Sequence, residues 1–182
     1  GYIFGTVYHI TYQYDTDLNA EILAELNKVD ASLSMFNKQS VITRVNNNQN
    51  IEVNDMFADV FTLAEKISND TNGAFDITVA PLVNAWGFGF KNGQLPTQSM
   101  VDSLKTFVGY KRVTLIDKHV KKADPRTTLD CGAIAKGYGC DMVAELLRRK
   151  GVANFMVEIG GEVVTSGISD RRLPWKIGVT KP

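Results

Sequence analysis

The sequence lacks an excess of either charge: its 182 residues include 20 Lys+Arg and 20 Asp+Glu, which gives a formal net charge of zero. This balance provides no electrostatic footprint for nucleic acid or for an anionic membrane surface. No apolar run approaches the roughly 20 residues that a membrane-spanning helix needs. With 44% hydrophobic and 22% charged residues, the composition is typical of a soluble globular protein.

Cysteine and histidine are also scarce, with two residues of each type. Cys131 and Cys140 are nine positions apart on one expected helical segment, which separates them by roughly 13 Å at the rise of an α-helix. A disulfide needs Cα atoms within about 7 Å, so we expect two free thiols. The only histidines, His9 and His119, form no cluster of zinc spacing and leave little for a histidine-based triad.

The residue pattern predicts strands and helices in alternation. Aromatic and β-branched residues predict a long strand over 2–13, where Gly5 indicates a bulge or a close approach. Apolar spacings of three and four predict a helix that follows the acidic caps at 15–17 and ends near 33, and a second from the cap Asn54 to about 72. The other expected elements are a helical turn at 41–45, an ordered loop at 82–89, a helix at 99–107, a hairpin at 112–116 and 119–123, a helix from the Asp130 segment to 150, and strands at 154–159, 162–168 and 175–180.

This order of elements, with hairpins at the end, predicts an α+β fold in which mixed or antiparallel sheets pack with helices. The length suits one domain or two small lobes, and we expect a single domain over residues 1–182.

The segment 130–141 carries the strongest chemical signal. It reads as a strand end, a glycine turn and the start of a helix, whose N-terminus exposes unpaired N–H groups and partial positive charge. Lys136 lies in or near the first turn, where a cation is locally unfavourable. Gly137 and Gly139 then lie inside the helix, each at a cost of roughly 1 kcal/mol relative to alanine. A nearby anion would explain the lysine, and a close approach by a ligand or a backbone would offset the glycines.

An alternative explanation is purely structural: the glycines relieve packing, and Lys136 points to water. The segment matches neither the phosphate-binding G-x-x-x-x-G-K-[ST] loop nor the dinucleotide-binding G-x-G-x-x-G fingerprint. Residue types alone therefore leave both interpretations open.

Six short motifs follow one another along nearly the whole chain. They are Gly5-Thr6-x-Tyr8; Ser34-x-Phe36 with Ser40 and Asn46; Phe75-Asp76-x-Thr78-x-x-Pro81-Leu82-Val83-x-x-Trp86-Gly87-Phe88-Gly89; Asp130-x-Gly132-x-Ile134-Ala135-Lys136-Gly137; Gly160-Gly161; and Trp175-x-Ile177-Gly178. Each motif is weak alone, and their order makes the pattern specific. In this order they resemble the motifs of one family, the ApbE family of FAD:protein FMN transferases.

The resemblance implies a Mg²⁺-dependent enzyme that splits FAD, attaches FMN to a threonine of an acceptor flavoprotein and releases AMP. Some relatives instead hydrolyse FAD to FMN and AMP, so a Mg²⁺-dependent FAD pyrophosphatase is one alternative, and a non-catalytic FAD-binding module is another. Family members are typically exported bacterial lipoproteins. The resemblance therefore implies a location in the periplasm or cell envelope, with a lipid anchor upstream of residue 1.

The resemblance also assigns residues. Its FAD contacts correspond to Phe4, Phe36, Ala74, Phe75, Asp76, Asp130 and Lys136, and its magnesium contact corresponds to the backbone carbonyl of Ala133. Phe4 replaces a frequent methionine and keeps an apolar wall for a flavin ring. The aromatic rings suit the flavin, while the helix N-terminus and the lysine suit the pyrophosphate. Core packing explains the aromatic residues equally well, and helix capping explains Asp130.

The family chain normally continues beyond a strand such as 175–180, into a segment that supplies a histidine near the flavin and side-chain ligands to magnesium. We therefore expect the C-terminal part of the family fold to lie in a remaining segment of the same protein or in another chain. Within residues 1–182 the resemblance offers magnesium one neutral carbonyl, whereas a hard dication takes roughly six oxygen ligands. It assigns no general base.

Overall fold

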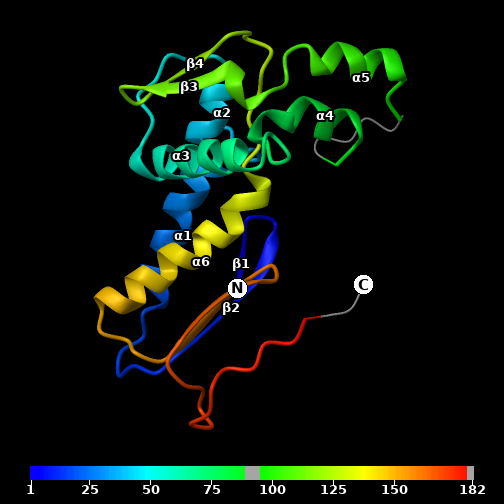
Figure 1. The fold of residues 1–182 in the computed structure, drawn as a ribbon. Helices are drawn as coiled ribbons and strands as arrows, with labels where there is room; N and C mark the ends of the chain where they lie inside the picture. The colour runs from blue at the N-terminus through cyan, green and yellow to red at the C-terminus, as the bar shows by residue number, and fades with distance from the viewer. Residues whose placement is uncertain (89–94, 180–182) are drawn as a thin grey trace. The chain divides into compact units, whose positions relative to one another are not determined.

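The computed structural model describes residues 1–88 and 95–179, with helices and antiparallel sheets that confirm the α+β prediction (Figure 1). The chain divides into two compact units, described here one at a time. The first unit comprises residues 1–30 and 134–182, and the second comprises residues 31–133. Whether residues 1–182 fold as a single domain stays a prediction.

The first unit contains a four-stranded antiparallel sheet in the order β1-β2-β5-β6. The strands are β1 (Tyr2–Ile3), β2 (Thr6–Tyr12), β5 (Phe155–Ile159) and β6 (Glu162–Ser166). Residues alternate between the two faces of β5, so Phe155, Val157 and Ile159 are fully buried. This alternation gives the sheet one apolar face and one face that is partly open to solvent.

The predicted long strand over 2–13 is wrong in one respect, because Phe4 and Gly5 form a tight turn that divides it into β1 and β2. Both residues have positive φ, 54° and 77°, the backbone geometry that suits two-residue hairpin loops. Gly5 adopts this conformation without a steric penalty. The interruption expected at Gly5 is therefore a chain reversal rather than a bulge.

Two helices pack on the apolar face of this sheet. Helix α1 (Asn19–Leu33) begins in the first unit, and helix α6 (Gly132–Arg149) continues into it from the second. Their buried side chains form one cluster with the strands. From α1 and α6 this cluster includes Ile22, Leu26, Cys140, Val143, Ala144, Leu146 and Leu147.

The start of α1 lies later than the acidic caps predict. Asp17 accepts a hydrogen bond from the backbone N–H of Asn19 at 2.9 Å and another from the Tyr12 hydroxyl at 3.2 Å. Asp17 thus fixes the chain just before the first helical residue, while Asp15 and Thr16 stay outside the helix.

The second unit is mainly helical and has a two-stranded sheet. Its helices are α2 (Val41–Asn46), α3 (Asp55–Asp70), η1 (Ile77–Val79), α4 (Ala80–Ala85), α5 (Gln98–Lys105) and η2 (Tyr110–Arg112), and its strands are β3 (Val113–Ile116) and β4 (His119–Lys122). The hairpin, the short helix α2 and the Asn54 cap of α3 confirm the predictions for these segments. The Asn54 carboxamide oxygen accepts from Phe57 N at 3.0 Å.

The predicted ordered loop over 82–89 is wrong up to Ala85, where the chain still belongs to α4, and right for residues 86–88, which lie outside any helix. Asp76 caps η1 by accepting from Thr78 N, and Pro81 at the start of α4 supplies the φ angle that a first helical turn needs. The Gly/aromatic alternation that weakens helix propensity begins only at Trp86, after α4 ends. Gly89 lies outside the described residues.

The predicted strand over 175–180 is not formed in its described part, residues 175–179. A single antiparallel bridge joins Ile168 to Pro174, and Trp175 donates its indole N–H to the Ser166 carbonyl at 2.9 Å. Proline has no N–H to continue a ladder, and a strand exists only where a neighbour pairs with it. Residue 180 lies outside the described part of the chain.

Within residues 1–88 and 95–179, we find no helix that combines the length and the apolar character needed to cross a membrane.

Candidate functional site

Asp130 lies in the second unit, at the end of an extended segment that leads into α6. Its N–H donates to the Ile77 carbonyl at 2.7 Å, and its Oδ1 accepts from the N–H of Gly132, the first residue of α6, also at 2.7 Å. A Cβ on Gly132 would lie 2.9 Å from that same Oδ1. The predicted capping role of Asp130 is therefore confirmed in the sense that its carboxylate binds the first helical N–H.

The segment before Asp130 is fixed by a residue to which the sequence assigned no role. The Asn46 side chain donates to the Leu129 carbonyl at 2.9 Å and accepts from the Leu129 N–H at 2.8 Å. Leu129 itself is fully buried. Asn46 thus serves as a substitute strand partner for the residue that immediately precedes Asp130. Its place in the family motif was the only sequence signal for it.

Cys131, between Asp130 and α6, is 2% exposed. Burial raises the pKa of the Cys131 thiol to about 12, and the nearby Asp130 charge adds to the effect. The thiolate is the reactive form of cysteine, so Cys131 is a packing residue at neutral pH rather than a nucleophile. The structure confirms both cysteines as free thiols.

Ala74, Phe75 and Asp76 lie together just before η1, where Ala74 is exposed and the other two are half-buried. Asp76 Oδ1 accepts from the N–H and the hydroxyl of Thr78, each at 2.7 Å, and Oδ2 accepts from Tyr110 N at 2.8 Å. The Thr78 hydroxyl in turn accepts from Gly109 N at 2.7 Å. Asp76 therefore ties η1 to the turn before β3, a structural role that the sequence did not reveal.

Phe36 lies in the loop between α1 and α2, with 72% of its surface exposed. Buried Ser40 closes this loop by donating to the Ser34 carbonyl at 2.6 Å and by capping α2 at Thr43 N. The Ser34 hydroxyl accepts from Asn37 N at 3.3 Å. The two serines of the family motif thus give Phe36 a defined loop and leave most of its ring accessible.

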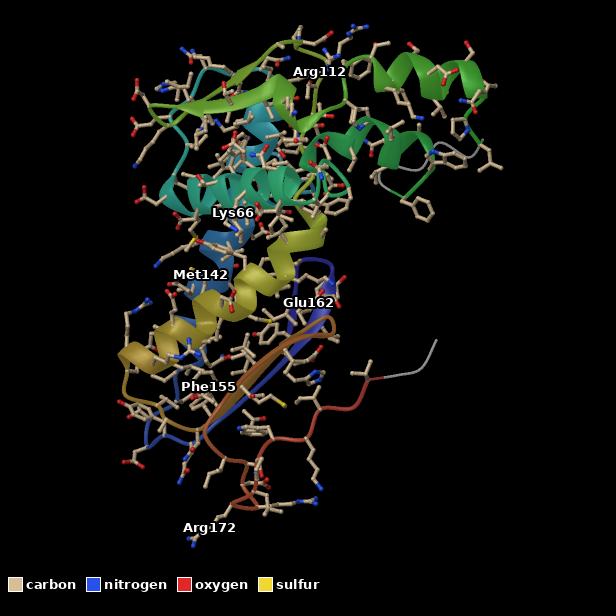
Figure 2. All side chains as sticks on the ribbon, in the orientation of Figure 1. Lys66, Arg112, Met142, Phe155, Glu162 and Arg172 are labelled. Carbon is tan, nitrogen blue, oxygen red and sulfur yellow. The ribbon has the colours of Figure 1, made fainter. Side chains whose placement is uncertain are left out.

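Lys136 lies in the first unit, four residues after Gly132, the first residue of α6. Its ammonium contacts Glu162 Oε1 at 2.8 Å and the Gly160 carbonyl at 3.4 Å. Figure 2 labels Glu162 at the turn end of the β5–β6 hairpin. Lys136 therefore does not point only to water, because a carboxylate of the chain itself pairs with its charge. The binding of an anionic ligand by Lys136 stays a prediction.

The β5–β6 turn is also fixed from its other side. Glu158 Oε1 accepts from Gly161 N at 2.7 Å, and Oε2 pairs with His9 Nδ1 at 2.8 Å. These hydrogen bonds, the one with His9 first, hold the pKa of the Glu158 carboxyl below its ordinary value. His9 is thus a strand residue with a specific partner, which a pattern of alternating faces does not show.

Phe4, the other predicted FAD residue of the first unit, is half-buried and packs against the core of that unit. A Cβ on Gly139 would lie 2.8 Å from Phe4 Cε2 and 3.4 Å from Ile159 Cδ1. Gly139 is thus approached by side chains rather than by the ligand or backbone that was expected, in agreement with the alternative in which the glycine relieves packing. The Phe4 ring packs against Gly139 in space that a side chain at position 139 would fill.

The predicted magnesium contact, Ala133, is an exposed residue in the first turn of α6. Across residues 1–88 and 95–179 there is no group of three or more His, Cys, Asp or Glu side chains arranged to hold a metal ion. The assignments of all the predicted FAD and magnesium residues stay predictions: Phe4 and Lys136 in the first unit, and Phe36, Ala74, Phe75, Asp76, Asp130 and Ala133 in the second.

Comparison with known proteins covers almost the entire chain. The sequence profile of the ApbE family matches residues 4–182. The chain is 37% identical to the FAD:protein FMN transferase of Haemophilus influenzae over 199 residues, which covers 100% of this chain and 58% of that protein. It is 33% identical to the protein of the same name from Escherichia coli K12, with coverages of 91% and 50%. The chain thus spans little more than half the length of these relatives.

The fold agrees with solved structures. The structure of the flavin transferase ApbE from Vibrio cholerae superposes with a TM-score of 0.94 at 34% identity, which covers 100% of this chain and 62% of that one. The apo form of the flavinyl transferase ApbE from Pseudomonas stutzeri gives a TM-score of 0.89 at 29% identity, with coverages of 98% and 63%. The ordered motifs, the profile match and the fold agree, and this chain belongs to the ApbE family.

Proposed function

We propose that the protein transfers FMN from FAD to a threonine of an acceptor flavoprotein and releases AMP. The observation that carries this proposal is sequence similarity across the whole chain to proteins named FAD:protein FMN transferase, at 37% and 33% identity. The fold supports the same conclusion, because two solved flavin transferases share it over nearly all of this chain.

The reaction required of the protein is a phosphoryl transfer, in which the FMN group moves from AMP to the threonine. The phosphoanhydride bond of FAD breaks, a phosphoester bond to the threonine oxygen forms, the hydroxyl proton leaves, and AMP departs with the bridging oxygen. Charge increases on the pyrophosphate oxygens in the transition state, so preorganised donors there lower the barrier. In this proposal Lys136 and the N–H groups that follow Gly132 in the first turn of α6 supply such donors, since the Gly132 N–H already donates to Asp130.

In the proposal, the flavin end of FAD contacts aromatic side chains. Phe36 suits this role because a ring that is 72% exposed on a closed polar loop leaves apolar surface for a ligand to cover. Phe75 and Phe4 are half-buried and combine a packing role with the proposed contact. Asp76 is a polar residue of the proposed FAD contact, and its hydrogen bonds to Thr78 and Tyr110 fix the position of its carboxylate.

Dependence on Mg²⁺ is part of the proposal and is supported by the family resemblance. Bound magnesium would supply charge stabilisation to the pyrophosphate. The predicted ligand in this chain is the carbonyl of Ala133, one neutral oxygen, while the ion takes about six oxygen ligands. The described residues do not fit a complete magnesium site by themselves, so we assign no step of the reaction to the metal.

The deciding experiment incubates the protein with FAD and Mg²⁺, with and without an acceptor flavoprotein that carries a target threonine. Transferase activity predicts AMP release together with covalent FMN on the acceptor, and loss of both when the threonine is replaced by alanine. Release of AMP and free FMN without an acceptor would instead establish an FAD pyrophosphatase. FAD binding without AMP release would establish a non-catalytic binding module.

We also propose that the protein is exported and lipid-anchored at the cell envelope. There it would meet acceptor flavoproteins of respiratory chains. The resemblance supports this location. Cell fractionation with an antibody against the protein tests it, since the proposal predicts recovery in the envelope fraction and accessibility to protease in spheroplasts.

A further inference from the structure

We propose that Glu162 is a positioning residue, which holds the ammonium group of Lys136 in the place where it binds the FAD pyrophosphate. This inference rests on the proposed function. Nothing in the sequence motif pairs the two residues, since Glu162 lies 26 positions after Lys136 and in a different element. The tertiary structure brings them into contact within the first unit.

The contacts leave Lys136 with capacity for a ligand. A lysine ammonium carries three N–H donors. Among residues 1–88 and 95–179, the two oxygens that it contacts are Glu162 Oε1 at 2.8 Å and the Gly160 carbonyl at 3.4 Å. These two acceptors orient the group and leave one donor for an anion. The Lys136 side chain keeps 31% of its surface exposed, which gives a ligand access.

The turn before Glu162 is shaped to receive the lysine. Gly160 has φ +55°, and a Cβ there would lie 2.7 Å from Thr6 Cγ2 and 3.1 Å from Lys136 Cδ. The aliphatic part of Lys136 therefore passes through space that any side chain at position 160 would take. The absence of that side chain allows the ammonium to reach both the Gly160 carbonyl and Glu162.

The backbone of Glu162 is itself well anchored. Glu162 pairs with Ile159 across the β5–β6 hairpin, its carbonyl accepts from Cys140 Sγ at 3.3 Å, and Glu158 holds the adjacent Gly161 N–H. A flexible lysine side chain loses rotamer entropy when it binds a ligand. Holding it in advance against the carboxylate of a residue whose backbone is anchored reduces that cost.

A plain surface ion pair is the competing explanation, and conservative variants distinguish the two. In Glu162→Gln the carboxamide oxygen still accepts from Lys136, so the position of the ammonium is kept while the negative charge is lost. In Glu162→Ala both are lost. Glu145→Ala is the matched control, because it removes a carboxylate of the same unit that pairs with Arg149 at 3.8 Å on α6.

The first measurement is FAD affinity by fluorescence quenching in a double-mutant cycle. Loss of one charge-assisted hydrogen bond in Lys136→Ala should weaken binding about tenfold to a hundredfold. We expect Glu162→Ala to weaken binding by part of that factor, Glu162→Gln and Glu145→Ala to bind within about twofold of the wild type, and Glu162→Ala to have no further effect in the Lys136→Ala background. Equal losses in both backgrounds, or a Gln variant as weak as the Ala variant, would overturn the proposal.

The second measurement needs no FAD. The rate at which an amine-acylating reagent modifies Lys136 is read by mass spectrometry of the peptide, with Lys150 as an internal reference. Release from Glu162 should raise the relative rate several-fold in Glu162→Ala and leave it near wild type in Glu162→Gln. An unchanged rate in Glu162→Ala would show that Glu162 does not hold Lys136. If the wild type bound no FAD, the proposed function and the ligand role would both fail, while this rate would still report whether the contact exists.

Discussion

Asn46 and Leu129, 83 positions apart, pair through two hydrogen bonds that mimic a strand ladder. The Asn46 carboxamide offers one donor and one acceptor, and the backbone of Leu129 offers the matching acceptor and donor. Since Leu129 is fully buried and directly precedes Asp130, this pairing determines where the chain enters α6. A side chain thereby completes a backbone segment that would otherwise have two unsatisfied polar groups.

Asn46→Ala should therefore lower the free energy of unfolding by about 2–4 kcal/mol, because it leaves a buried N–H and a buried C=O without partners. Urea denaturation followed by circular dichroism measures the change. Asn47→Ala is the control, since Asn47 is exposed at the C-terminal end of α2 and has an ordinary φ of −81°, and it should cost less than about 1 kcal/mol. Equal costs for the two variants would contradict the assigned role of Asn46.

Phe36→Ala should weaken binding of FAD and of FMN but leave AMP affinity unchanged, because the proposed contact is with the flavin end of the ligand. Stability should change little, since the ring is 72% exposed. Isothermal titration with the three ligands measures the effect. Phe88→Ala, at an aromatic residue that is 85% exposed and is not a predicted FAD contact, is the control for loss of a surface ring. An equal loss of AMP affinity would contradict the assignment of Phe36 to the flavin end of FAD.

Replacing either of two glycines of α6 by alanine should change the stability of the protein, in opposite directions for the two positions. At Gly137 no described atom comes within 4 Å of an added Cβ, so Gly137→Ala should stabilise the protein by about 0.5–1 kcal/mol through helix propensity. At Gly139 the Cβ would lie 2.8 Å from Phe4 Cε2, so Gly139→Ala should destabilise it by about 1–3 kcal/mol through overpacking. Thermal denaturation of both variants measures this. A stabilising Gly139→Ala would mean that Phe4 moves freely.

The two buried thiols predict a stability loss at high pH. The pKa values of Cys131 and Cys140 are each raised from 9.0 to about 12, in both cases mainly by burial. Between pH 9 and 12 the unfolded thiols release their protons while the folded ones keep them. Their contribution to the free energy of unfolding is therefore fully present below pH 9 and declines as the pH rises toward 12.

Urea denaturation at pH 8 and pH 10 measures this decline, and a Cys131→Ala/Cys140→Ala double variant corrects for tyrosine and lysine titration. The difference in the free energy of unfolding between the wild type and the double variant should become smaller, or change sign, at pH 10. At pH 8 a chromogenic disulfide should label the native thiols only as fast as the protein opens. Rapid stoichiometric labelling of the native protein would contradict their burial.

Local sequence patterns predicted most of the helices and hairpins correctly. The apolar stripe of Ile22, Leu26, Val29 and Leu33 is 0–2% exposed in α1, because a spacing of three and four residues puts these side chains on one helix face. The Asn54 cap and the helical turn after Ser40 are equally local. Each needs only a side chain within three residues of the backbone group that it binds.

The errors arose where a local pattern has two solutions. A β-branched run is compatible with one long strand or with two strands joined by a tight turn, and positive φ at Phe4 and Gly5 decides for two. Residues 175–179 have strand-forming side chains, yet a strand also needs a paired neighbour. Residues 82–85 were compatible with a loop or with a helix, and they complete α4, which has Pro81 in its first turn.

The sequence by itself determined the family, the α+β class and the residues proposed to bind FAD. The reason is that the order of the motifs and the periodicity of apolar residues can be read from the linear sequence alone. Only the tertiary structure decided what those residues contact. It joined Glu162 to Lys136, Asn46 to Leu129 and Phe4 to Gly139. Such pairs depend on turn geometry and on the direction in which each side chain leaves its helix or strand. Neither can be predicted from the number of residues that separate the two partners.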